Sequence, residues 1–260
     1  MSDSNSLPLE LGEARARFAA DGYLLLPGLV ERSRLSSLST AILDQYRSEV
    51  ARGTLFSGGG NMSGHLNCFP GADSRFVYAA LAARGVFALA QELSSEPLRL
   101  PNVGCNLTLA GSSAQNEHID GYADRPFLVV NVAAVDTDLH NGAMEIVAGT
   151  HTRTYKYWEI ALGSLRRKRV TMQQGDALLR ISTLWHRGMP NRSLQPRPML
   201  AFTWEGGGST LADPYAQHDG RIRFLPNRFD TDWRGRLLER AFVTAPRLGT
   251  AYHVARSLFS

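Results

Sequence analysis

Two histidines and one aspartate are the residues whose types and spacing could hold a catalytic metal ion. His118 is the only one of the seven histidines with a carboxylate two positions later, at Asp120. Side chains at i and i+2 of an extended segment point to the same side, so both can reach one ion. With His186 as a third ligand, two imidazoles and a carboxylate would leave three octahedral positions open. An oxygen-activating ferrous centre needs that many, two for a bidentate 2-oxo acid and one for dioxygen.

Arg197 is the residue that could bind the far end of such an acid. It stands eleven positions after His186 and opens an apolar stretch. Turn residues at 190–193 separate the two. We therefore expect the strand before His186, Ala177–Ile181, to pair as a hairpin with the strand that begins near Arg197. A buried guanidinium would bind a carboxylate in a bidentate fork, whereas an unpaired one in a barrel interior would be costly.

The part of the chain that precedes these residues begins with helical patterns. Apolar residues recur at helical spacing in three stretches, and one short apolar stretch closed by Pro27-Gly28 predicts a strand. The helices are expected at 10–20, 33–50 and 75–93, and the strand at Tyr23–Leu26. Between them, Gly53–Gly71 is expected to be a long functional loop, because glycine is too dense at 58–67 for a regular element. The polar residues Met1–Ser6 are expected to fray.

Strand patterns dominate from residue 98 onward. Six stretches alternate or are continuously apolar, and Gly, Pro and Asn separate them, which is typical of a sandwich or barrel. These stretches are 98–109, 127–135, 143–147, 169–173, 177–181 and 198–204. Helical character returns around Arg234–Ala241. We expect a single domain over 1–260, with a helical N-terminal layer and active-site loop at about 1–95, a β core at about 96–205 and a C-terminal extension at about 206–260. The extension would form a lid or a dimer contact.

Composition argues against several classes of protein. The net charge of +4 invites a nucleic-acid partner, but the arginines are spread along the chain, with no basic stripe interleaved with aromatics. The one dense run, Arg166–Arg169, is expected to be a solvated face or loop, with attraction of an anionic substrate group as the alternative. Cys68 and Cys105 make no disulfide framework, and no secretory signal or membrane-spanning apolar run is visible. We expect a cytoplasmic monomer or homodimer that acts on a small-molecule substrate and has neither nucleic acid nor membrane as a partner.

The order and spacing of these motifs resemble the phytanoyl-CoA dioxygenase family. The resemblance runs from about residue 14 to residue 204. It rests on Phe18–Gly28, His118-x-Asp120, Asn141–Met144, Gly149-Thr150-His151, Gly175-Asp176, His186, Asn191-x-Ser193 and Arg197. It implies a mainly β fold whose core is a double-stranded β-helix, the jelly roll also found in cupins. It further implies Fe(II) as the metal, with 2-oxoglutarate and O2 as cosubstrates.

The same resemblance implies a role for seven residues. His118, Asp120 and His186 would be the iron ligands. The cosubstrate pocket would contain Arg197 as the anchor of 2-oxoglutarate, Asn131 as a further contact, and Asn106 and Thr108 as weaker candidates. Family members that transfer halide replace the carboxylate by a small residue, so the presence of Asp120 disfavours halogenation.

The reaction implied by the resemblance is an oxidation coupled to the decarboxylation of 2-oxoglutarate to succinate and CO2. We expect hydroxylation of an unactivated C–H bond of a small molecule, such as a natural-product tailoring step, with desaturation, cyclisation and epimerisation as open variants. A polybasic pocket that would favour a CoA thioester is not visible. The alternative is a cupin-like metal-dependent hydrolase or isomerase, or a small-molecule binding protein without redox chemistry. Arg197 would have no obvious task in that alternative.

Five polar residues are candidates for substrate contacts. Asn61, His65 and Asn67 lie in the glycine-rich loop, and Tyr122 and Asp124 follow the first two metal ligands. His65 could equally stabilise the loop, and Tyr122 and Asp124 could be exposed. The prediction rests on their position beside the expected metal site.

Overall fold

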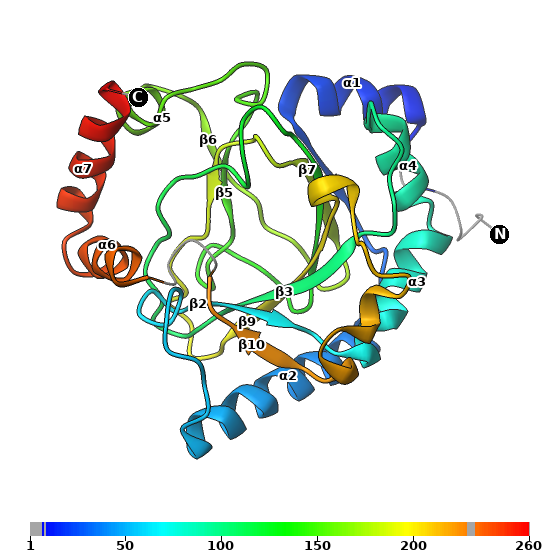
Figure 1. Ribbon diagram of the computed structural model, residues 1–260. Helices are drawn as coiled ribbons and strands as arrows, with labels where there is room; N and C mark the ends of the chain where they lie inside the picture. The colour runs from blue at the N-terminus through cyan, green and yellow to red at the C-terminus, as the bar shows by residue number, and fades with distance from the viewer. Residues whose placement is uncertain (1–6, 8, 228–231, 260) are drawn as a thin grey trace.

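The computed structural model describes residues 7, 9–227 and 232–259 of the 260-residue chain. Two antiparallel sheets lie at the centre, and helices surround them (Figure 1). The expected fraying of Met1–Ser6 falls outside the described residues. The antiparallel, sheet-rich fold expected from the sequence is confirmed.

Seven strands form the main sheet, in the order β1-β7-β4-β9-β3-β2-β10, and all neighbouring pairs are antiparallel. Their bounds are β1 Tyr23–Leu26, β2 His65–Phe69, β3 Asn102–Thr108, β4 Leu128–Ala133, β7 Ala177–Ile181, β9 Arg197–Thr203 and β10 Arg223–Leu225. Alternate residues of a strand face opposite sides of the sheet. On β7, Leu179 packs into the larger core beneath the helices, whereas Leu178 packs into a second core inside the β structure.

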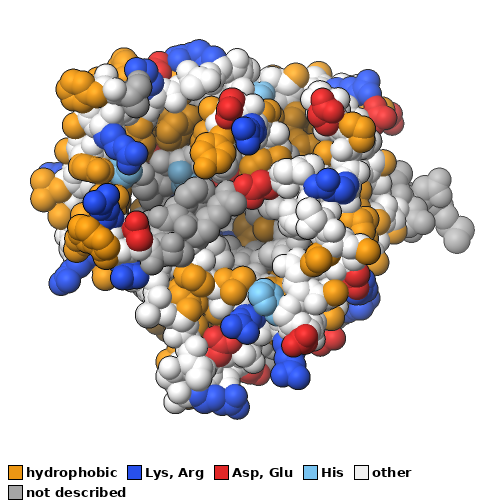
Figure 2. Space-filling view, viewed as in Figure 1, with side chains coloured by type: hydrophobic (Ala, Val, Ile, Leu, Met, Phe, Trp, Pro, Cys, Tyr) orange, Lys and Arg blue, Asp and Glu red, His pale blue; other side chains and the backbone are white. Residues whose placement is uncertain are grey.

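Three short strands form the second sheet, in the order β6-β5-β8. Their bounds are β5 Glu145–Val147, β6 Arg167–Arg169 and β8 His186–Arg187. Ile146 of β5 shares a buried cluster with Leu178 and Met199 of the main sheet. The two sheets therefore enclose a common interior, and the surface is hollowed near the centre of the face seen in Figure 2.

Four helices from the first 93 residues lie along one side of the β structure (Figure 1). They are α1 Leu11–Asp21, α2 Arg32–Arg52, α3 Arg75–Ala83, preceded by the 3-10 turn η1 Ala72–Ser74, and α4 Val86–Leu93. Leu35 of α2 and Leu81 of α3 are fully buried in one core with Val130 and Phe202 of the sheet. The same part of the chain also contributes β1 and β2 to the main sheet. A separate helical layer over 1–95 therefore stays a prediction.

The remaining helices lie on the opposite side, towards the C-terminus (Figure 1). They are α5 Tyr157–Leu162, α6 Trp233–Thr244 and α7 Pro246–Leu258, whereas the 3-10 turns η2 Glu205–Gly207 and η3 Pro214–Gly220 lie on the side of α3 and α4. The α7 helix packs on α5, where the Trp158 backbone N–H donates to Ser257 Oγ at 3.1 Å. Trp233, Leu237 and Leu248 of α6 and α7 are exposed. A lid or dimer role for this extension stays a prediction.

No single helix in the described part of the chain has the length and apolar character needed to cross a membrane. The segment Ala72–Ala83 together with Val86–Leu93, bent by 65° at the break, meets that test only as a pair and only by length and composition.

Five of the six strands expected between residues 98 and 204 are present, as β3, β4, β5, β7 and β9. The strand β7 matches its expected bounds residue for residue. The sixth is displaced towards the N-terminus, because β6 covers Arg167–Arg169 and Met172 beyond it makes only an isolated bridge with Thr137. The helix expected around Arg234–Ala241 is present within α6.

Two expectations about the chain path are wrong. The stretch Gly53–Gly71 is not all loop, because Gly60 and Gly64 make a turn at positive φ and the chain then enters β2. The strand β7 does not form a hairpin with β9. Instead β4 lies between them and pairs with both. The chain between 182 and 196 crosses to the second sheet to form β8, so the two strands that it connects are not neighbours.

Candidate metal centre

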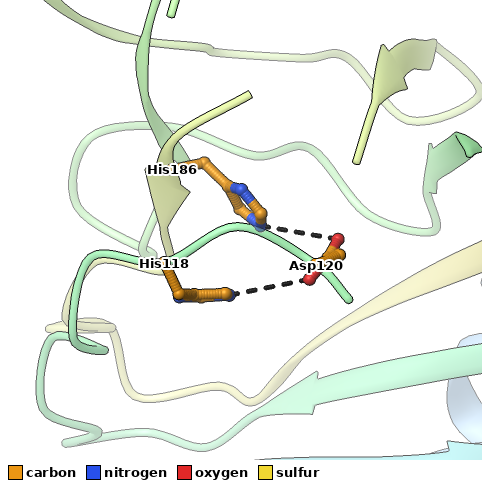
Figure 3. Close-up of side chains that lie close together, drawn as sticks. All are labelled: His118, Asp120 and His186. Atoms are coloured by element: carbon orange, nitrogen blue, oxygen red, sulfur yellow. Dashed lines mark ion pairs between the residues drawn. The ribbon is translucent and has the colours of Figure 1, made fainter. Parts of the chain in front are cut away.

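Backbone pairing between two distant segments brings the three expected ligands together. His118 forms an isolated antiparallel bridge with His186 of β8, in which each backbone N–H donates to the other residue's carbonyl at 3.0 Å. Asp120 follows two residues later, and its backbone N–H donates to the carbonyl of Ser182 at 2.9 Å. The side chains of all three residues converge on one point (Figure 3).

The distances within this cluster suit a single metal ion. One possible ligand atom from each residue lies within 4.8 Å of the other two. His118 Nε2 lies 3.8 Å from Asp120 Oδ1, and His186 Nε2 lies 3.7 Å from Asp120 Oδ2. Among the residues that the structure describes, this is the one group of three or more such side chains close enough to share an ion.

The outer nitrogen of each imidazole is held by a backbone carbonyl. His118 Nδ1 lies 2.7 Å from the carbonyl oxygen of Asn116, and His186 Nδ1 lies 2.9 Å from that of Leu184. A carbonyl oxygen can only accept, so Nδ1 carries the proton in both rings and Nε2 keeps its lone pair. Both lone pairs are thereby directed towards Asp120, the arrangement in which a neutral histidine binds a metal.

The protonation states also fit a divalent cation. Burial holds the pKa of His186 well below its usual range, so this imidazole is neutral at pH 7. Burial alone would raise the pKa of Asp120. The positive charge of Arg180 and the hydrogen bond that it donates outweigh it, and the pKa falls well below its usual range. An ionised carboxylate and neutral imidazole are the forms that ligate metals. The donor set therefore fits the ferrous ion that the sequence predicts.

Arg180 is a neighbour of the cluster that sequence reasoning missed. Its Nη2 donates to Asp120 Oδ2 at 2.6 Å, and its Nε donates to Asn131 Oδ1 at 3.1 Å. The signal was an arginine inside the apolar strand Ala177–Ile181, where a charged residue needs a partner. The side chain of Asn131 is therefore engaged by Arg180, and its contact with a cosubstrate stays a prediction.

Arg197 is buried in the same interior, with 4% of its surface exposed. Its Nη2 donates to Thr108 Oγ1 at 2.9 Å and to the Gly142 carbonyl at 3.3 Å, and its Nε donates to the Asn141 carbonyl at 3.1 Å. Burial lowers the pKa of Arg197 to about 10. Within the described chain, no carboxylate lies close enough to form an ion pair with it. The guanidinium is thus a buried cation with only neutral acceptors.

A chain of polar side chains leads away from Arg197 across the main sheet. Thr108 Oγ1 donates to Asn106 Oδ1 at 3.3 Å, and Asn106 Nδ2 donates to Asn67 Oδ1 at 3.3 Å. Asn67 and Asn106 also line a cavity of about 240 Å³, together with Gly104 and other residues of the main sheet. Four of the expected site residues therefore form one continuous strip.

The remaining substrate candidates differ in their surroundings. His65 is buried, its Nε2 lies 2.8 Å from the Ser113 carbonyl, and burial lowers its pKa to about 4. Asn61 donates to the Phe56 carbonyl within its own loop. Tyr122 is 64% exposed and Asp124 is also exposed. Substrate contacts for these residues stay predictions.

The arginine run at 166–169 is more than a solvated face. Arg167 lies 2.8 Å from the buried Glu117, the residue before His118 in the chain. Arg169 Nε donates to the Ala143 carbonyl at 2.8 Å. Burial raises the pKa of Glu117. Arg167 therefore supports the segment that carries the first metal ligand, because a buried carboxylate needs charged partners, whereas Arg169 supports the chain at Ala143.

Comparisons with known proteins give a family match and a likeness of fold. The model of one family, Phytanoyl-CoA dioxygenase (PhyH), matches residues 18–199. Among similar solved structures is the epimerase SnoN in complex with Fe3+, alpha ketoglutarate and nogalamycin RO, which is 22% identical, with a TM-score of 0.58 over 74% of this chain and 82% of that one. EctD from S. alaskensis with 2-oxoglutarate and 5-hydroxyectoine is 21% identical, with a TM-score of 0.59 over 78% and 77%. SnoK, a carbocyclase from nogalamycin biosynthesis, is 15% identical, with a TM-score of 0.59 over 75% and 83%. At these identities the likeness establishes the fold.

Proposed function

Because this chain belongs to the phytanoyl-CoA dioxygenase family, we propose that it is an Fe(II)- and 2-oxoglutarate-dependent oxygenase acting on a small molecule. One observation carries the proposal. The ligand cluster of His118, Asp120 and His186 shares the interior with Arg197, a buried cation that has no carboxylate partner among the described residues. A metal and a dianionic cosubstrate together would explain both features.

The three ligands have separate tasks in this proposal. His118 and His186 would hold iron through Nε2, because their Nδ1 atoms are committed to backbone carbonyls. Asp120 would supply the one negative charge. Three ligands on one side leave room for the 2-oxo acid and dioxygen. When bound, ferrous iron supplies the chemistry that couples O2 and 2-oxoglutarate to C–H oxidation, with succinate and CO2 released.

Arg197 would bind the distal carboxylate of 2-oxoglutarate. Its N–H groups are already oriented by Thr108, Asn141 and Gly142, so little side-chain entropy is lost on binding. A carboxylate would also add a charge-assisted pair to a guanidinium that has only neutral acceptors. Asn131, Asn106 and Thr108 are proposed to complete this pocket.

Hydroxylation of an unactivated C–H bond is the outcome that we propose. The presence of Asp120 keeps three protein ligands at the metal and disfavours halide transfer. The similar structures include an epimerase and a carbocyclase, so the same fold serves other outcomes as well. A natural-product tailoring step is the proposed setting, with the substrate entering near Asn67 and His65.

The finer fold assignment belongs to the same proposal. We propose one domain over 1–260 with a double-stranded β-helix core and a helical N-terminal layer. Two antiparallel sheets around a shared interior support this assignment, as does the likeness to the solved structures.

The test is anaerobic reconstitution of the purified apoprotein with ferrous iron followed by 2-oxoglutarate. We expect the weak visible charge-transfer band of the iron chelate in the wild type. The band should disappear in His118→Ala and weaken in Arg197→Ala, whereas Arg153→Met, which removes an exposed ion pair with Glu159, should leave it unchanged. Absence of the band, with zinc bound tightly instead, would favour the cupin-like hydrolase or binding protein. If the band is present, succinate release across a compound panel would identify the substrate.

A further inference from the structure

The barrel interior contains a second buried guanidinium, that of Arg180. It lies on β7, opposite Val129 of β4 and Tyr23 of β1, and 4% of its surface is exposed. It shares the inner side of β7 with Leu178. A buried charge is costly unless it is paired and hydrogen-bonded, so the partners of Arg180 indicate what it is for.

Two contacts hold Arg180 and aim it at the metal cluster. Asn131 Oδ1 accepts from Nε at 3.1 Å and sets the plane of the guanidinium. Nη2 then donates to Asp120 Oδ2 at 2.6 Å. Nη1 is buried and has no hydrogen-bond partner among the described residues. The guanidinium is thus oriented so that Asp120 receives a hydrogen bond, although one nitrogen of Arg180 is left without a partner among the described residues.

Asp120 depends on this contact more than the other two ligands depend on theirs. Each histidine is fixed by the carbonyl two residues before it, within its own segment. Asp120 lies outside the strands, and Gly121, at a φ of +71°, follows it immediately. The side chain that anchors its carboxylate comes from β7, sixty positions away in the chain. Without Arg180, rotation of the carboxylate would be opposed only by its histidine neighbours.

We propose that Arg180, oriented by Asn131, is a positioning residue that fixes the carboxylate of Asp120 as the third metal ligand. The inference rests on the proposed function, because it assumes that the cluster binds a metal. Arg180 occupies Oδ2, while Oδ1 accepts no hydrogen bond from any described residue and stays available to an ion. Asn131 accepts a hydrogen bond from Arg180, so it supports the metal ligand Asp120 only through the arginine.

The positive charge of Arg180 and its orienting contact with Asp120 predict opposite effects of its removal on the affinity for a metal ion. Its positive charge repels a divalent cation, so removing the charge alone would tighten metal binding. Loss of the anchor leaves the carboxylate misoriented, and residues that orient a metal ligand typically contribute 10- to 100-fold in affinity. In the proposed arrangement Arg180 donates to the Asp120 carboxylate, whose negative charge offsets much of its repulsion for the ion. We therefore expect the effect on orientation to prevail.

The test is titration of the apoprotein with Co2+, followed by calorimetry and by the visible d–d absorption of the bound ion. Arg180→Met and Arg180→Lys should both bind Co2+ about 10- to 100-fold more weakly and alter the d–d spectrum. Lysine keeps the charge but cannot donate from two fixed positions, so it should resemble methionine. Asn131→Ala should shift the affinity in the same direction by less. Arg75→Met, which removes an exposed pair with Asp213, is the matched control and should bind as the wild type.

The possible outcomes separate this inference from the proposed function. If Arg180→Met binds Co2+ as tightly as the wild type, or more tightly, the positioning role is overturned. The same holds if Arg180→Lys keeps the wild-type affinity and spectrum. If Arg180→Met does not fold, an unchanged affinity in Asn131→Ala overturns the inference by itself. Failure of the wild type to bind Co2+, or equal binding by His118→Ala, would instead refute the metal centre.

Discussion

Replacing Arg197 with methionine should leave the stability of the apoprotein almost unchanged while removing most of the affinity for 2-oxoglutarate. Truncation of a buried, paired arginine normally costs about 3–5 kcal/mol, because it leaves the partner charge buried alone. Arg197 has no such partner among the described residues. Its substitution therefore tests whether the guanidinium serves the fold or a ligand.

The expected change in the free energy of unfolding follows from two opposing contributions. Burial lowers the pKa of Arg197 from 12.5 to about 10. At about 1.4 kcal/mol for each pKa unit, the charged form costs the folded state about 3 kcal/mol. The folded pKa is the lower one, so this penalty is fully present at pH 7 and fades only as the pH rises from about 10 towards 12.5. Methionine removes it but leaves three acceptors, Thr108 Oγ1 and the carbonyls of Asn141 and Gly142, at about 1 kcal/mol each. The two terms nearly cancel, and we expect a change within about 1 kcal/mol.

Urea denaturation of the apoprotein and calorimetric titration of the Mn2+-loaded protein with 2-oxoglutarate measure the two effects. Losing a buried charge-assisted pair with the cosubstrate costs about 3 kcal/mol, so the affinity should fall about 100-fold. Arg153→Met is the control, because its pair with Glu159 is exposed and should affect neither measurement by much. A loss of more than about 3 kcal/mol in the apoprotein would refute the stability argument and make Arg197 a structural residue. An unchanged affinity would refute its role as the cosubstrate anchor.

Three further substitutions test the surroundings of the site. Burial lowers the pKa of His65 from 6.5 to about 4, so the unfolded state takes up the proton first as the pH falls. Relative to His65→Gln, the wild type should therefore lose about 3 kcal/mol of unfolding free energy between pH 6.5 and 4, and parallel pH profiles of the two proteins would contradict this. Glu239 Oε1 accepts from Gly60 N, Ser63 N and Ser63 Oγ at 2.6–2.9 Å, so Glu239→Ala should speed amide exchange at 58–64 about 30-fold with little change in Tm. Unchanged exchange would show that Glu239 does not hold this loop. Gly142 has a φ of +92°, and a Cβ there would lie 2.7 Å from the Met189 carbonyl oxygen. Gly142→Ala should therefore lower the unfolding free energy, measured by urea denaturation, by about 2 kcal/mol, and a neutral effect would show that the turn relaxes.

Most of the strands could be predicted because each carries its own signal. The continuous apolar runs that became β4 and β7 are buried along their length, as a central strand requires. The two-residue strand β8 is too short to show any period, and β10 lies in a stretch without alternation that pairs only with β2. The hairpin prediction failed for a related reason. Periodicity tells which face of a strand is buried, but it does not identify the neighbouring strand.

The metal cluster could be predicted because its members sit in recognisable local patterns. The i, i+2 spacing places His118 and Asp120 on one side, and the positions of His186 and Arg197 along the chain, together with the family resemblance, indicated the other two. The bridge that joins His118 to His186 required the fold itself, since it links segments more than sixty residues apart. The ion pair of Glu117 with Arg167 was hidden in the same way, because a charge run looks solvated until its partner is placed.

The two buried arginines illustrate how much of a functional site can be read from the amino-acid composition of its strands. An isolated charge in an apolar strand signals that a partner exists, and Arg180 and Arg197 both gave that signal. For Arg180 the partner is a residue of the chain, Asp120, so stability and function depend on the same contact and both should suffer when it is removed. For Arg197 the described chain supplies only neutral acceptors, so the fold bears a cost that a ligand would offset. Stability and function are therefore uncoupled at Arg197 and coupled at Arg180, and a pair of substitutions that differ in this respect distinguishes a ligand anchor from a positioning residue.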